Sequence, residues 1–153
     1  MGEVQYGVAT TKDLQQMVEL LGVLFTDEAE FQPDPGKQKR ALEAILANPG
    51  IGKLFVAREG RRVIAMASLL YTVSTAEGGK AAWFEDLVVH PDERKRGIGE
   101  ALLKQVVAQA RAEGVLRITL LTDMQNERAQ AMYRRVGFTG SPMKPMRLKI
   151  KPS

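Results

Sequence analysis

The residues best suited to chemistry in this chain gather in one short stretch, residues 89–99. It reads Val-His-Pro-Asp-Glu-Arg-Lys-Arg-Gly-Ile-Gly, so three cationic side chains directly precede Gly97 and Gly99. An apolar run precedes the stretch and an amphipathic run follows it, which predicts a strand, a tight loop and a helix. Such a loop directs backbone N–H groups and a helix N-terminus at one point, and arginine and lysine add positive charge there. The stretch therefore predicts a binding site for a phosphorylated ligand.

The glycine spacing excludes two common phosphate-binding motifs. Gly97-Ile98-Gly99 lacks the third glycine of the dinucleotide-binding fingerprint, and no Gly-Lys-Ser/Thr follows as in a P-loop. A lone Gly-x-Gly is more often a turn with solvated charges. Here it follows an apolar strand pattern and opens an amphipathic helix pattern, and a second strand–helix unit begins later at Asn126. These neighbours favour the ligand site over the simple turn.

Composition narrows the class of protein. The 153 residues are 44% hydrophobic and 26% charged, which predicts one soluble domain over residues 1–153. There is no cysteine and His90 is the single histidine, which excludes disulfides, thiolate metal sites and multi-histidine metal sites. The net charge of +4 is too small to require nucleic acid. No apolar run approaches the roughly 20 residues of a membrane span, and no secretory signal is evident. We therefore expect a cytoplasmic protein with no membrane partner.

Periodicity and turn residues predict an alternating order of elements. The predicted strands are residues 4–9, 52–58, 62–72, 81–89, 115–121 and 144–150. The predicted helices are residues 37–47 and three others: one that follows a capping box at Thr10 and Asp13 and ends near Phe25, one from the basic loop to Ala112, and one from Asn126 to Gly137. This order implies an α/β or α+β domain with a mixed central sheet.

Two sequence signatures resemble those of a known family. Residues 87–103 are similar to the acetyl-CoA loop of the GNAT superfamily of N-acetyltransferases, in which Arg/Gln-x-x-Gly-x-Gly/Ala follows a strand. Asn126, Tyr133 and Gly137-Phe138 are similar to its second signature. The order of elements fits over nearly the whole chain. The resemblance implies a mixed, mostly antiparallel sheet flanked by helices and splayed between the strands near 81–89 and 115–121.

The resemblance also implies acetyl-CoA as co-substrate and no metal. Backbone N–H groups of the loop would hold the pyrophosphate, and the pantetheine arm would pair with the strand before it. Asn126 would bind the arm, although a helix N-cap explains this residue equally well. The implied cofactor-binding residues are Leu87, Val88, Val89, Arg94, Lys95, Arg96, Gly97, Ile98, Gly99 and Asn126.

Two side chains are candidates for acid–base catalysis. The family carries a tyrosine at the helical position of Tyr133, near the sulfur, so Tyr133 is the implied acid, whereas helical spacing alone favours a core residue. Glu85 is the implied base, because many relatives carry a glutamate on this strand. Regular alternation puts Asp86 on the opposite face, so only one of the two carboxylates can face the cleft and Asp86 competes for the role.

The resemblance implies direct transfer of an acetyl group to a primary amine in a ternary complex. The alternative is a non-catalytic acyl-CoA-binding regulatory module, and a nucleic-acid-binding domain ranks below both. The acceptor is expected to be a small molecule or peptide amine, and its identity stays open. Asp27, Glu28 and Glu30 suit a cationic amine but equally fit a solvated helix end. A homodimer is possible through the apolar C-terminal residues.

Overall fold

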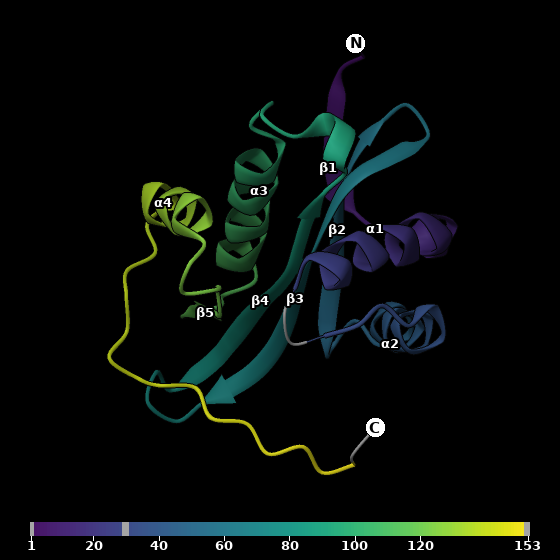
Figure 1. The fold of residues 1–153 in the computed structure, drawn as a ribbon. Coiled ribbons are helices and arrows are strands. Elements are labelled where there is room, and N and C mark those ends of the chain that lie inside the picture. The colour runs from purple at the N-terminus through teal and green to yellow at the C-terminus, as the bar shows by residue number, and fades with distance from the viewer. Residues whose placement is uncertain (1, 29–30, 152–153) are drawn as a thin grey trace.

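The computed structural model describes residues 2–28 and 31–151, and its centre is a five-stranded sheet (Figure 1). The strands lie in chain order and are β1 (Val4–Val8), β2 (Gly52–Glu59), β3 (Arg62–Ser74), β4 (Gly79–Val89) and β5 (Ile118–Leu120). The first four pair antiparallel, and β5 runs parallel to β4. The predicted mixed, mostly antiparallel sheet is confirmed.

Four helices cover the two faces of this sheet. Helices α1 (Leu14–Asp27) and α2 (Pro35–Ala47) lie on one face, and α3 (Ile98–Ala112) and α4 (Glu127–Val136) lie on the other (Figure 1). Two apolar clusters fix this arrangement. Met17, Leu21 and Leu42 of α1 and α2 pack with Leu54 and Met66 of the sheet. On the other face, the apolar stripe of α3 packs against β2, β3 and β4 around Phe84. The burial of these faces provides the main stabilisation of the fold.

Local capping sets where the helices begin, as the sequence predicts. Thr10 and Asp13 form the expected capping box before α1, in which the Thr10 N–H donates to Asp13 Oδ2 at 2.8 Å. Asp13 is buried and also accepts from the Nε of Arg58 at 3.2 Å, which ties the start of α1 to β2. Asn126 caps α4, and Gly137 ends it with φ of +123°. The helix interior between those caps then points one apolar face at α3.

Two predicted strands differ from the structure. The strand expected over 115–121 is only three residues long in β5, and the segment 144–150 forms no strand. Met146, Leu148 and Ile150 alternate with basic residues, yet each is more than 80% exposed (92%, 82% and 85%). Alternation is a local property, whereas a strand forms only where a partner pairs with it. None of the described helices is long and apolar enough to cross a bilayer.

Candidate functional site

The site begins with an irregularity in β4. Met66 of β3 pairs with Val88 of β4, but Ser68 pairs with Glu85, so β4 has one extra residue between these two pairs. This is a β-bulge, and within it Asp86 adopts a positive φ of +59°, a conformation that non-glycine residues rarely adopt. The neighbouring strand β5 pairs with β4 only at Ala82–Phe84 in the described structure. From Glu85 onward β4 therefore has an open edge, which agrees with the expected splay of the sheet.

The bulge decides which way the two carboxylates face. Phe84 packs in the α3–α4 core, so alternation turns Glu85 toward the α1–α2 face. Regular alternation would turn Asp86 back to the α3–α4 face. Its side chain instead lines a hollow between α1 and α2. Leu87 and Val89 then pack against the α3–α4 core. The expectation that Glu85 and Asp86 lie on opposite faces is therefore wrong, because regular alternation stops at the bulge.

Asp86 has the electrostatic environment of a proton acceptor. Burial, and to a smaller extent the nearby charge of Glu85, raises the pKa of Asp86 to about 6. The Ser68 hydroxyl opposes this rise by donating to Asp86 Oδ2 at 3.3 Å, and Glu28 adds a smaller increase. The side chain of Glu85 is exposed and makes no hydrogen bond in the described structure. A carboxyl group that titrates near pH 6 can bind and release a proton close to neutral pH.

The basic loop follows β4 and has the geometry of an anion site. Lys95 and Gly97 adopt positive φ values of +67° and +75°, and α3 begins directly afterwards at Ile98. Within the described residues, the backbone N–H groups of Lys95 to Gly99 donate no hydrogen bond. A Cβ placed on Gly97 would meet no atom within 4 Å, so the loop leaves open space beside these donors. The residues present therefore fit a pyrophosphate held by backbone groups.

The arginines of the loop have structural partners. Arg96 binds Glu59 at 3.0 Å and Glu93 at 2.6 Å, and its side chain is only 21% exposed. Burial opposes ionisation of Glu93, but hydrogen bonds from Arg62 and Arg96 lower the pKa of this carboxyl overall. Arg94 donates from Nε to the Val89 carbonyl at 3.2 Å and lies 3.6 Å from Asp27 of α1. The side chain of Arg96 thus holds the loop in place, and its backbone remains available to a ligand.

Tyr133 lies on the opposite side of β4 from Asp86. Its ring packs edge-on against Phe84 and Phe138, with centroid distances of 6.5 and 5.9 Å. Burial raises the pKa of Tyr133, so its hydroxyl stays protonated at neutral pH. The hydroxyl has no hydrogen-bond partner in the described chain. The ring therefore packs against the core, as helical spacing predicts, and the acid role of Tyr133 stays a prediction.

Asn126 performs the capping role that the sequence predicts. Its Oδ1 accepts from the backbone N–H of Ala129 at 3.0 Å, at the start of α4. The amide nitrogen of the same side chain has no partner among the residues described. The cap therefore fixes the side chain without using its donor group.

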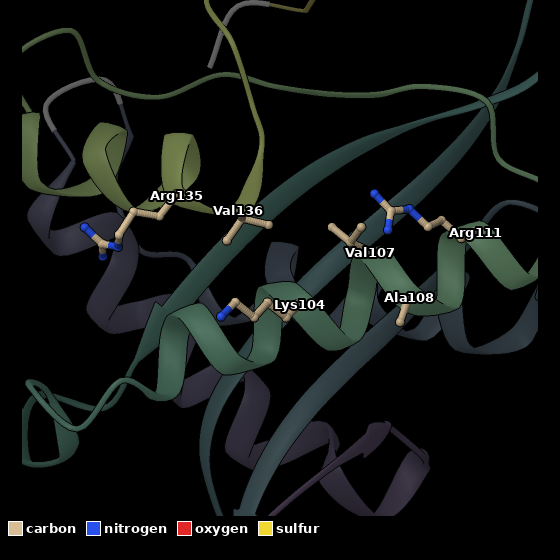
Figure 2. Close-up of a pocket in the computed structure, with 6 residues that line it drawn as sticks. All are labelled: Lys104, Val107, Ala108, Arg111, Arg135 and Val136. Atoms are coloured by element: carbon tan, nitrogen blue, oxygen red, sulfur yellow. The ribbon is translucent and has the colours of Figure 1, made fainter.

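A second hollow, of about 230 Å³, lies between α3 and α4. Figure 2 shows that its lining comes from these two helices, with cationic groups contributed by both. Glu100 partly neutralises them, because it pairs with Arg135 at 2.8 Å and with Lys104 at 3.4 Å. None of the candidate catalytic residues lines this hollow.

Sequence reasoning missed two features of the site. The strand pattern does not reveal the bulge: Glu85 and Asp86 together interrupt an apolar run, and a regular strand would fit them equally well. The hollow on Asp86 is assembled from α1, α2 and β4, which are distant in sequence. Among the described residues there is no group of three or more histidine, aspartate or glutamate side chains that could hold a metal ion.

Comparison with known proteins agrees with this geometry. Residues 14–138 match the model of the acetyltransferase (GNAT) family. Glucosamine 6-phosphate N-acetyltransferase from Trypanosoma brucei brucei is 28% identical over 138 residues, which cover 89% of each chain. An integron cassette protein from a salt-marsh metagenome superimposes with a TM-score of 0.85 at 25% identity, covering 97% of this chain and 92% of that one.

A further structural neighbour was solved with the co-substrate. This protein from Clostridium acetobutylicum, described as a predicted acetyltransferase and solved with acetyl-CoA, has a TM-score of 0.80 at 20% identity and shares the fold over 97% of both chains. The open edge of β4, the basic loop and the matched residues lead to one conclusion. The chain belongs to the acetyltransferase (GNAT) family, and its activity is the transfer of an acetyl group from acetyl-CoA to an amine.

Proposed function

We propose that the reaction takes place at the open edge of β4, between the α1–α2 hollow and Tyr133. The observation that carries this proposal is the bulge, because it places Asp86 in the hollow while Leu87 and Val89 face the other side. The loop from Arg94 to Gly99 binds the pyrophosphate of acetyl-CoA through its backbone N–H groups. The pantetheine arm pairs with the open edge of β4 at residues 87–89, as an added strand would.

The residues around this edge divide the chemistry between them. Asp86 accepts a proton from the ammonium group of the acceptor, because only the neutral amine is a nucleophile. The amine nitrogen attacks the thioester carbonyl, and a backbone N–H of Leu87 or Val88 stabilises the oxyanion that forms. When the C–S bond breaks, Tyr133 donates its proton to the leaving thiolate. The phenolate then recovers a proton from the nitrogen of the new amide. Asn126 holds the arm through its free amide group.

The loop is tested by Gly97→Ala. The added methyl group enters the open space beside the N–H donors and forces alanine into a positive φ, so we expect the dissociation constant of acetyl-CoA to rise about tenfold or more. The measurement is calorimetric titration. Gly60→Ala is the matched control, because Gly60 also has a positive φ with open space around it but lies in the β2–β3 turn. Equal affinity in the two variants would argue against a phosphate site in this loop.

Tyr133→Phe tests the acid and separates an enzyme from a binding module. Removal of the hydroxyl keeps the ring packing on Phe84 and Phe138, so acetyl-CoA affinity and thermal stability should change little. We expect kcat to fall by roughly 10²-fold, the lower range for a general acid. The assay is the release of free CoA thiol in the presence of an amine. A kcat that stays within threefold of the starting protein would remove Tyr133 from the mechanism.

The base is tested by pH profiles of Asp86→Asn and Glu85→Gln. Asp86 accepts a proton only when ionised, and its ionised fraction rises through about pH 6. The kcat/KM of the unmodified protein should therefore fall as the pH drops through 6. In Asp86→Asn the fall of kcat/KM at low pH should disappear and the rate should drop at least 10²-fold. Glu85→Gln should keep the pH dependence and the rate of the unmodified protein. The reverse pattern would assign the base to Glu85, as the family resemblance implies.

We also propose that the protein works in the cytoplasm as a homodimer, on a free amine rather than on nucleic acid or a membrane. The exposed apolar residues of the segment 144–150 support the homodimer, because monomers rarely expose such a run. Light scattering after size exclusion measures the mass in solution. We expect the full chain to elute as a dimer and a Met146→Ser, Leu148→Ser variant as a monomer. A monomeric full chain would disprove the dimer.

A further inference from the structure

The hollow on Asp86 has apolar walls. It has a volume of about 250 Å³ and lies between α1 and α2, above the bulge of β4. Leu21 and Phe25 of α1 form one wall, and Ala41, Leu42 and Ile45 of α2 form the other. This volume holds roughly eight water-sized groups. Because these walls offer no hydrogen-bonding side chains, they suit a hydrocarbon group of a few carbon atoms.

The polar groups of the hollow are few and have unlike charges. Asp86 supplies a carboxyl group at the open edge of β4, and Lys37 and Gln38 contribute from the first turn of α2. The sequence offers Asp27 and Glu30 as attractors of a cationic acceptor, but neither is among the described residues that line this hollow. Asp27 lies 3.6 Å from Arg94 of the basic loop and does not line the hollow, and Glu30 lies outside the described residues. Asp86 is the one carboxylate in the lining of the hollow, where it can meet one ammonium group; Glu28 and Glu85 lie near enough to raise its pKa but do not line the hollow.

This arrangement discriminates between classes of amine. The second ammonium group of a diamine would lie among aliphatic side chains or beside the cation of Lys37, and either position is unfavourable. The hydroxyl groups of an amino sugar would lose water without gaining partners along the same walls. An alkyl or aryl group would instead replace water against Leu21, Phe25 and Ile45.

From this we infer that the acceptor is a primary monoamine carried on an apolar group, with its nitrogen at Asp86 and its apolar group between α1 and α2. The inference rests on the proposed function, because it takes Asp86 as the point where the amine reacts. It adds the substrate class, which the comparisons do not give: the trypanosomal relative acts on glucosamine 6-phosphate by its name.

A homologous series of amines tests the inference on the full chain. We would measure kcat/KM by CoA release at saturating acetyl-CoA for ethylamine, butylamine and hexylamine. Each buried methylene should raise kcat/KM roughly threefold to fourfold until the hollow is filled. The matched probe is 1,5-diaminopentane, which replaces the terminal methyl group of hexylamine with an ammonium group. It should react at least tenfold less efficiently than hexylamine, and glucosamine 6-phosphate less efficiently still.

Two variants of α2 test whether the hollow causes the preference for longer alkylamines. Ala41→Phe fills the space between the helices, so it should bring the hexylamine-to-ethylamine ratio of kcat/KM down by roughly tenfold. Ala47→Phe is the matched control, because Ala47 is exposed on the same helix and does not line the hollow. It should leave the ratio unchanged. Acetyl-CoA affinity should be the same in both variants, which shows that each is folded.

The outcomes separate this inference from the proposed function. A flat alkylamine series, a preference for the diamine or glucosamine 6-phosphate, or an unchanged ratio in Ala41→Phe would overturn the apolar acceptor and leave acetyl transfer intact. If the chain binds acetyl-CoA but acetylates none of these amines, both the inference and the proposed reaction centre fail.

Discussion

The structure depends on the interruption of β4 at Asp86. Up to Phe84 the strand pairs on both sides, with β3 and with β5. Beyond Phe84 one edge is open and an extra residue is inserted opposite β3. An open edge presents unpaired backbone groups to any extended ligand, and the bulge reverses the order in which side chains face the two layers. If β4 paired regularly with β3 and β5 along its whole length, it would have no open edge, and Asp86 would not face α1 and α2.

The two layers of helices then give the two sides of β4 different properties. The α1–α2 side has an apolar hollow lined by Asp86, and the α3–α4 side has the half-buried side chain of Tyr133. Burial raises the pKa of both groups, which makes Asp86 a better proton acceptor and keeps Tyr133 protonated. One physical effect, the loss of water around an ionisable group, thus acts on both the base and the acid that we propose.

The charged side chains of the basic loop hold its backbone in position through ion pairs. Arg96 is held between Glu59 and Glu93, and Glu93 also pairs with Arg62 of β3 at 3.0 Å. These pairs connect the loop to β2 and β3, so its N–H groups are already in position for the pyrophosphate that we propose they bind. Preorganisation of this kind lowers the entropy lost on binding. The paired Arg94 and Asp27 similarly connect the loop to α1, next to the acceptor side.

The sequence by itself determined the parts of this protein that depend on local pattern. The capping box at Thr10, the helix from Asn126 to Gly137 and the basic loop with Gly97 are all visible in the residue order, because caps, helical periodicity and left-handed turns are set by near neighbours. The family resemblance added the sheet order and the co-substrate. Only the tertiary structure decided the positions of Asp86 and of residues 144–150. The direction of Asp86 depends on pairing between β3 and β4, and its raised pKa depends on burial under α1 and α2. The segment 144–150 has the alternation of a strand but pairs with none of the described strands. Pairing and burial join residues that are distant along the chain, so no local pattern reports them.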